Sequence, residues 1–250
     1  MKNKILNIAL IGAALMATTS CSDYLETSSV SKTDGDFVFS NMVTARAAMN
    51  GAYTEWHGAI SSHIFGDGLF YAFDIAGSDI MRHPEAYSKQ LPRHQPESSY
   101  PNGTIAGTYD PVTYGKEAPS IAYAVLFSVI GKANAITSAI EGMEDFEAMQ
   151  SQTSASDLSQ LYGEAVCLRA TAYRELIKYY GDVPYQSVMG QAAVGLAPRD
   201  SIYDVIIKDV QKVAPLMRPV GTDNKNNFSS TYAYALIGRL ALEAGGYQTR

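Results

Sequence analysis

The sequence predicts an all-α protein with stacked, TPR-like helices of the α-solenoid type, interrupted by one long irregular loop. Apolar residues recur at helical spacing in five segments of the 250-residue chain. In the second half of the chain, these helical segments follow one another after short breaks. Small residues such as Ala165, Ala172 and Ala233 lie there among large ones, which suits close helix–helix packing. No segment alternates strongly enough to predict a β-sheet, and the spacing is too irregular for a strict repeat.

Two helices are expected within the first 141 residues. The first covers residues 41–57, and the second covers residues 120–141, where Gly142 can end it because glycine adopts the left-handed cap conformation without steric cost. The apolar run 121–131 is shorter than the roughly 20 residues of a membrane span, so it predicts a buried core helix. The expected inward residues are Ala45, Ala48, Met49, Ala52, Tyr53 and Trp56, then Ala122, Val125, Leu126, Val129, Ala133, Ile136 and Ile140.

Three more helices are expected after polar breaks. The clearest of them begins at Asp157, which we expect to cap the helix, with Gln160 in the reciprocal capping position. It ends within residues 181–184, which contain a glycine and a proline. The others cover residues 200–214 and 230–244. The expected inward residues are Leu158, Leu161, Ala165, Leu168, Ala172, Leu176 and Tyr179; Ile202, Val205, Ile206 and Val213; and Ala233, Leu236, Ile237, Leu240 and Ala244.

Residues 59–118 form the expected irregular insertion. They hold five prolines, six glycines, five tyrosines and three of the four histidines, and no helical period persists through them. A connection of this length inside a compact domain is usually functional or disordered. Its aromatic content argues against disorder, so we expect it to carry function.

The N-terminus has the order of a bacterial lipoprotein signal. Lys2 and Lys4 precede an apolar stretch, Ile5–Met16, and only small residues follow up to Cys21. A cysteine at that place is where a lipoprotein is cut and acylated, so we expect Cys21 to be the lipid-bearing first residue of the mature protein. The alternatives are an ordinary signal peptide with a chance cysteine and an N-terminal membrane helix, for which the apolar stretch is too short.

This interpretation divides the chain into three parts. Residues 1–20 are the signal peptide, residues 21–40 are a polar tether rich in Ser and Thr, and residues 41–250 are the helical domain. Nothing downstream covers the outer face of the last expected helix. We therefore expect the chain to be the N-terminal part of a longer protein, because a terminal solenoid helix needs a polar capping surface.

The charge and the cysteine content exclude several classes of protein. The formal net charge is −6, and without Lys2 and Lys4 the chain keeps 17 basic and 25 acidic residues. Such a chain offers no basic stripe to nucleic acid and gains nothing from an anionic membrane surface. Apart from Cys21 the only cysteine is Cys167, which leaves no pair for an intramolecular disulfide.

The sequence contains no clear catalytic, cofactor-binding or metal-binding motif. The chain has no G-x-S-x-G elbow, phosphate loop or H-E-x-x-H motif, and its four histidines fit no compact zinc pattern. Residues 223–227 are expected to form a polar turn and not a calcium loop. The acid pairs Asp74/Asp79 and Glu144/Asp145 would be catalytic only at the separation that glycosidases use. We therefore expect a protein that is not an enzyme and binds no cofactor.

Five short motifs, in order along the chain, resemble those of the SusD/RagB family of outer-membrane nutrient-binding lipoproteins. The strongest is similar to that family's E-A-x-x-L-R-A-x-x-Y-x-x-L…Y-Y-G-D-V-P signature. The matching segments are Cys21–Leu25, Asn50–Tyr53, Lys132–Ile136, Gly163–Leu176 with Tyr179–Pro184, and Pro198–Ser201 with Ile207–Val210. Where family members often carry a Trp and a Tyr four residues apart, this chain has Tyr123 and Phe127, so ring packing is expected to persist there.

The resemblance implies a function at the bacterial surface. It implies a lipoprotein anchored in the outer membrane and facing outwards, which binds glycans or other nutrient oligomers. It also implies delivery of the ligand to a SusC-like, TonB-dependent transporter, with no bond broken. Members of the family are considerably longer than this chain, so the resemblance covers their N-terminal part.

The stretch from Tyr87 to Tyr114 is the best candidate for the ligand surface. A sugar ring has apolar C–H faces and a rim of hydroxyls, which suit flat aromatic rings and directional polar groups respectively. The candidate residues are Tyr87, Arg93, Gln95, Tyr100, Asn102, Tyr109, Asp110 and Tyr114. The alternative for this stretch is a solvated loop with its tyrosines tucked against the helices. For the whole protein, the alternatives are a helical scaffold for a protein partner and a hydrolase with an unrecognised acid pair.

Most of the motif residues are expected to serve the fold. Arg169 lies on an apolar helix, and buried charges are normally paired, so we expect it to contact a nearby acid or a helix end and not a ligand. Tyr173, Tyr179 and Tyr180 are expected to make contacts between helices.

Overall fold

The computed structural model describes residues 39, 41–65, 118–190, 195–222, 224 and 226–245. Its helices are α3 (Met42–Gly58), η1 (Ala59–Ile64), α5 (Ala118–Glu141), α6 (Phe146–Gln150), α7 (Asp157–Tyr180), α8 (Arg199–Val213), η4 (Ala214–Leu216) and α9 (Ser230–Glu243). The described residues are 72% helical and contain no strand, which confirms the all-α prediction.

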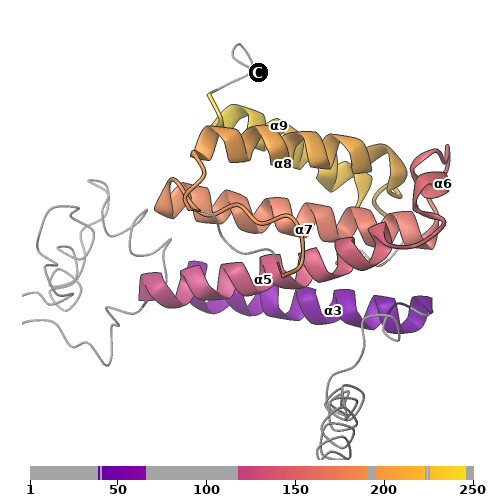
Figure 1. The fold of residues 1–250 in the computed structure, drawn as a ribbon, viewed down its shortest axis with the longest axis horizontal. Coiled ribbons are helices and arrows are strands. Elements are labelled where there is room, and N and C mark those ends of the chain that lie inside the picture. The colour runs from indigo at the N-terminus through magenta and orange to yellow at the C-terminus, as the bar shows by residue number, and fades with distance from the viewer. Residues whose placement is uncertain are drawn as a thin grey trace, which may run out of the picture. The chain divides into compact units, whose positions relative to one another are not determined.

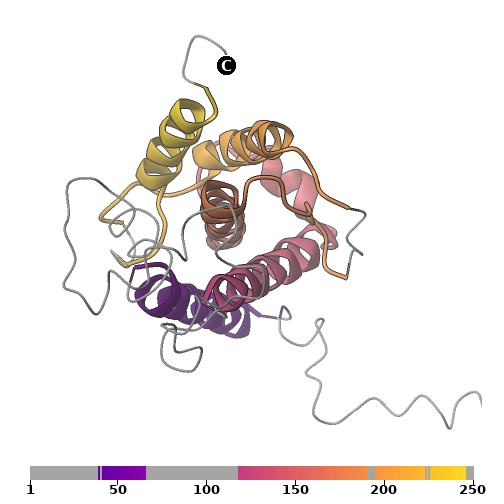
Figure 2. The same cartoon turned by 90° about the vertical axis from the view of Figure 1, so that its left-hand side faces the viewer.

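The long helices stack in layers around α7. Figure 1 shows α3 and α5 on one side of α7, and α8 and α9 on the other. Figure 2 looks along the helices and places α7 in the centre. Every residue of α7 from Ser159 to Tyr173 is buried as a result. Of the seven residues expected to face inward, five are buried and Leu158 and Tyr179 are half-buried, and burial extends around the helix because neighbours cover it on opposite sides.

The two ends of α7 are capped by different residues. At the N-terminus, Ser156 is the cap and not Asp157: the Ser159 amide donates to Ser156 Oγ (3.1 Å), and the Ser156 amide donates to Ser159 Oγ (2.8 Å). This reciprocal capping box lies one residue before the predicted Asp157–Gln160 pair. At the C-terminus the prediction was right, since Gly181 ends the helix with a φ of 73° that favours glycine.

Helices α3 and α5 match their expected faces closely. Ala45, Met49 and Ala52 of α3 are buried, and six of the seven expected residues of α5 are buried while Val125 is half-buried. The stretch Ile121–Glu141 is long and apolar enough to cross a membrane by length and composition alone. In the fold it packs against α3 and α7, which confirms the prediction of a core helix.

The helix that begins with α3 extends further than expected. Residues 59–64, predicted to open the irregular insertion, form the π-helix η1, in which the Phe65 amide donates to the Ile60 carbonyl at 2.8 Å. The short helix α6 was not predicted. The remainder of the expected insertion, from residue 66 to residue 117, lies outside the described residues, as do residues 1–38.

Helices α8 and α9 deviate from the predicted pattern at single positions. Ile202, Ile206 and Val213 of α8 are buried, but Val205 is 38% exposed, so its predicted inward position was wrong. Tyr203, Ile207 and Val210 are buried instead, because α8 packs against both α7 and α9. In α9 the buried residues are Ala233, Leu236 and Leu240, while Ile237 and Ala244 are half-buried.

A buried carboxylate ties α3 to α7. Glu164 is fully buried and accepts hydrogen bonds from Arg46 Nη1 (2.5 Å), Tyr53 Oη (3.1 Å) and Gln160 Nε2 (2.8 Å). Tyr53 also accepts a bond from the Phe228 amide (3.0 Å), which brings the segment before α9 to the same place. An ionised buried carboxylate is tolerated only when it is paired and hydrogen-bonded, so Glu164 requires this arrangement.

Two helical glycines offer a matched test of the packing around α7. A Cβ at Gly163 would lie 2.7 Å from Met217 Sδ, and closer still to its Cγ, whereas a Cβ at Gly131 would meet nothing within 4 Å. Because Met217 is itself buried, we expect Gly163→Ala to lower the free energy of unfolding by about 1–3 kcal/mol through overpacking. Gly131→Ala should raise it by up to about 1 kcal/mol. Urea unfolding followed by circular dichroism measures both, and equal stabilisation by the two changes would contradict the packing described.

Candidate functional site

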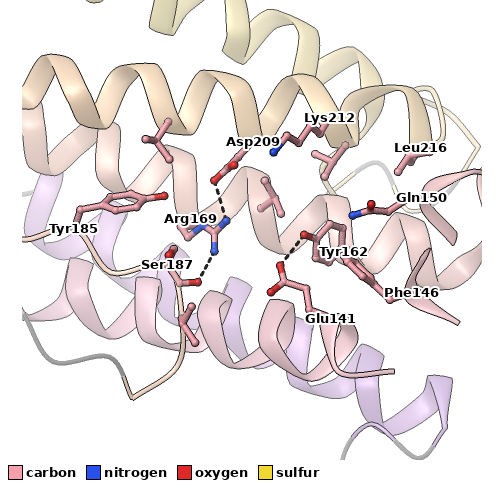
Figure 3. Close-up of a pocket in the computed structure, with 14 residues that line it drawn as sticks. Glu141, Phe146, Gln150, Tyr162, Arg169, Tyr185, Ser187, Asp209, Lys212 and Leu216 are labelled. Carbon is pink, nitrogen blue, oxygen red and sulfur yellow. Dashed lines mark hydrogen bonds and ion pairs between the residues drawn. The ribbon is translucent and has the colours of Figure 1, made fainter. Parts of the chain in front are cut away.

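The side chain of Arg169 lies at the centre of the candidate site. Its Nη2 donates to Asp209 Oδ2 of α8 (3.1 Å), and its Nη1 donates to Asn134 Oδ1 of α5 (3.1 Å) and to the Ser187 carbonyl (2.9 Å). Figure 3 shows the bonds to Asp209 and Ser187. The Arg169 side chain is only 6% exposed. The prediction that Arg169 pairs with an acid is confirmed.

The same helices hold the segment after α7 in place. Asn134 Nδ2 donates to the Gln186 carbonyl (2.9 Å), and the Tyr173 hydroxyl accepts from the Gln186 amide (2.7 Å). Further on, the Arg199 amide at the start of α8 donates to Asp182 Oδ1 (2.9 Å). Residues 182–187 are therefore fixed at both ends, which positions Tyr185 and Ser187 beside Arg169.

A row of aromatic rings continues from this segment. Tyr173 lies 5.0 Å from Tyr185 and 6.4 Å from Phe127, and Tyr123 lies 4.8 Å from Phe127 and 5.1 Å from Tyr180, measured between ring centroids. Such pairs add to the stability that burial alone provides. The expected packing of Tyr123 and Phe127 is confirmed, as are the contacts between helices expected of Tyr173 and Tyr180.

A cavity of about 530 Å³ opens beside Arg169, between α7 and α8. This volume lies within the range of about 300–1,000 Å³ that is typical of small-molecule sites. Its fourteen lining residues come from α5, α6, α7, α8, η4 and the segment after α7. They are Glu141, Phe146, Gln150, Tyr162, Val166, Arg169, Tyr185, Ser187, Val188, Val205, Asp209, Lys212, Val213 and Leu216. Figure 3 shows these side chains around the opening.

Two phenols in the cavity have distinct roles. The Tyr162 hydroxyl donates to Glu141 Oε1 (2.8 Å), and its ring packs edge-on against Phe146. The Tyr185 hydroxyl is buried and makes no close hydrogen bond among the described residues, although the Asp209 carboxylate lies near enough to act on it. Burial raises the pKa of both phenols, with Glu141 adding to the effect at Tyr162 and Asp209 at Tyr185. Both therefore stay protonated at neutral pH.

The charges around the cavity balance. Arg169 and Lys212 carry positive charge, and Glu141 and Asp209 carry negative charge. The lining groups can donate and accept hydrogen bonds to a polar molecule against a partly apolar wall. Within the described residues no three His, Cys, Asp or Glu lie close enough to hold a metal.

The sequence predicted a different set of functional residues. Cys21 and the loop candidates Tyr87, Arg93, Gln95, Tyr100, Asn102, Tyr109, Asp110 and Tyr114 are outside the described residues, and so are Asp74 and Asp79. Glu144 and Asp145 are exposed in the turn between α5 and α6. In the expected polar turn, the Asn226 amide donates to Asn224 Oδ1 (3.1 Å).

The sequence reasoning missed the cavity, and of its polar lining it singled out only Arg169. Glu141, Tyr162, Tyr185 and Lys212 come from separate elements, and no spacing along the chain relates them. The available signal was the Arg169 side chain on a helix with an apolar face. It indicated a polar cluster, but it did not indicate an open space beside that cluster.

Comparisons with known proteins agree with the fold. The SusD-like family model described as "Starch-binding associating with outer membrane" matches residues 23–242. A solved SusD homolog from Bacteroides thetaiotaomicron superposes with a TM-score of 0.58 at 16% identity, over 86% of this chain and 39% of that one. The surface glycan-binding protein A from Bacteroides fluxus gives a TM-score of 0.55 at 16% identity, over 81% and 40% of the two chains.

A laminarin-binding SusD-like protein is similar to the same degree, with a TM-score of 0.54 at 19% identity over 80% of this chain and 40% of that one. At these identities the likeness shows the fold alone. The chain spans about two fifths of the length of the solved structures it matches. No curated protein matches it.

The pairing of Arg169 can be tested against an exposed ion pair. Asp209→Leu leaves the buried guanidinium without its carboxylate, and we expect it to lower the free energy of unfolding by about 2–3 kcal/mol. This is below the usual cost for a fully buried pair, because the Asp209 side chain is 23% exposed. Asp200→Asn is the control, since its contact with Arg199 joins two largely exposed side chains and should matter by less than about 0.5 kcal/mol. Urea unfolding that finds similar small effects for both variants would refute the structural role of Asp209.

Proposed function

The chain belongs to the SusD-like family, and on that premise we propose that it is an outer-membrane lipoprotein that binds glycans or other nutrient oligomers. The observation that carries this proposal is the match of a starch-binding, outer-membrane family model to residues 23–242. The protein holds its ligand without breaking a bond and passes it to a SusC-like, TonB-dependent transporter. Two of the similar structures are named for glycan or laminarin binding, which supports the ligand class.

The ligand surface in this proposal includes the tyrosine-bearing stretch of residues 87–114. Tyr100 and Tyr109 supply flat rings for the C–H faces of a sugar, and Arg93, Asn102 and Asp110 supply directional hydrogen bonds. The helical stack supports such a stretch through its packed core. A rigid scaffold that presents a variable loop is a common arrangement for binding proteins.

The membrane attachment in this proposal runs through Cys21. Residues 22–40 are rich in Ser and Thr and act as a tether between the lipid and the first helix. Stable anchoring requires more than one acyl chain, because a single chain binds a membrane only marginally. A multiply acylated N-terminal cysteine satisfies this requirement.

Anchoring through Cys21 has a direct test. We expect the protein expressed in a bacterial host with lipoprotein processing to carry acyl chains on an N-terminal Cys21 and to sediment with the outer membrane. Cys21→Ser should move it to the soluble fraction, whereas Cys167→Ser should leave the anchoring unchanged, because Cys167 is buried in the core. Mass spectrometry of the N-terminus and fractionation measure this. Unmodified, soluble wild-type protein would rule out the anchor.

Binding is tested by calorimetry of the mature protein against a panel of polysaccharides. We expect saturable binding of at least one glycan with no product formed. The double variant Tyr100→Ala, Tyr109→Ala should weaken that binding at least tenfold, because each ring lost removes a stacking surface. Tyr234→Ala is the control, as Tyr234 is exposed on α9.

Each other result selects an alternative. Release of shorter sugars would identify a hydrolase, and the absence of any binding would favour a helical scaffold for a protein partner. Equal binding by the loop variant and the Tyr234 control would move the ligand surface away from residues 87–114.

A further inference from the structure

The cavity beside Arg169 is lined by residues between Glu141 and Leu216, none of which belongs to the tyrosine-bearing stretch 87–114. Its floor consists of the buried residues Tyr162, Val166 and Arg169 of α7 and Val213 of α8. Val188 and Val205 stand at its rim, where both are exposed. A ligand that enters there contacts α7 and α8 directly. This space is therefore a second place where the protein can hold a small molecule.

The polar groups of the cavity are held in position before any ligand arrives. Arg169 is fixed by Asp209, Asn134 and Ser187, and Glu141 is fixed by the Tyr162 hydroxyl. The partly exposed Asp209 carboxylate has acceptor capacity beyond the single bond that Arg169 makes to it. Preorganised groups of this kind lower the entropic cost of binding.

One group in the cavity lacks a close hydrogen bond. The Tyr185 hydroxyl is buried, and the only group that acts on it as an acceptor within the described residues, the Asp209 carboxylate, makes no close bond to it. Buried polar atoms are almost always satisfied, by the protein, by water or by a ligand. A ligand with hydroxyl groups would satisfy Tyr185 and could accept from or donate to its neighbours at the same time, since a hydroxyl does both.

The charge pattern selects against an ionic ligand. An anion would face the carboxylates of Glu141 and Asp209, and a cation would face Arg169 and Lys212. Desolvating a charged ligand is costly unless an excess of opposite charge compensates, and the four charges here sum to zero. A neutral ligand avoids this cost.

From these observations we propose that the α7–α8 cavity is a second carbohydrate site, which takes a short neutral saccharide. The hydroxyls of the sugar meet Tyr185, Asp209 and Glu141, while its C–H surface lies against the apolar wall. The choice of a saccharide among neutral polar molecules rests on the carbohydrate-binding function proposed above. The location and the neutrality of the ligand rest on the cavity itself.

The test compares three variants of the mature protein with the wild type. Val205→Trp fills the mouth of the cavity from an exposed position, and Tyr185→Phe removes only the phenol hydroxyl. Leu242→Trp is the control, because Leu242 is 67% exposed on α9 and a tryptophan there leaves the cavity open. The probes are glucose, galactose, mannose and their disaccharides, with a uronic acid and free amino acids as charged and zwitterionic comparisons. Calorimetry measures the affinities, and thermal unfolding monitors stability.

We expect the wild type to bind at least one neutral saccharide and to prefer it to the charged probes. Val205→Trp should weaken this binding at least tenfold, and Tyr185→Phe should weaken it about five- to tenfold, as the loss of one hydrogen bond predicts. The unfolding temperature of Tyr185→Phe should change little, because the hydroxyl makes no close hydrogen bond in the free protein. Leu242→Trp should bind the small saccharide as the wild type does.

The contrary outcomes separate the two proposals. If polysaccharide binds but no short saccharide does, or if the loop variant abolishes saccharide binding while Val205→Trp does not, the second site is refuted and the proposed function stands. A preference for the uronic acid or for an amino acid refutes the neutral ligand class. If neither polysaccharide nor saccharide binds the wild type, both proposals fail.

Discussion

The arrangement of the helices depends on the buried guanidinium of Arg169, which belongs to the central helix α7. Arg169 sits on α7, which neighbours cover on opposite sides, so its charge must be neutralised and hydrogen-bonded within the protein. The partners are Asp209 on α8, Asn134 on α5 and the Ser187 carbonyl after α7. Once these contacts form, α5, α7, α8 and residues 182–187 have fixed positions, and the cavity lies beside them as a consequence.

The motifs that reveal the family therefore act first on the fold. The carboxylate of Glu164 organises α3 and α7 in the same way that Arg169 organises α5 and α8. These contacts constrain the helical stack and leave the loops free to vary.

The same physics explains which features of the fold and of the site could be predicted from the sequence. Helix positions followed from apolar spacing and from Gly181, and the pairing of Arg169 followed from the cost of burying a charge. The inward position of Val205 was wrong, and the burial of α7 on all sides was not predicted, because both depend on which helices surround a given one. The cavity could not be predicted, since Glu141, Tyr185 and Lys212 are brought together only by tertiary packing.

We propose that a helical stack built on Arg169 holds a carbohydrate without cleaving it. The most direct test is a crystal structure of the mature protein grown with the best-bound oligosaccharide. The account predicts intact sugar against the side chains of residues 87–114, with a sugar unit also in the α7–α8 cavity and the Arg169–Asp209 pair unbroken. Sugar bound elsewhere with both places empty, or density for cleaved product, would contradict it.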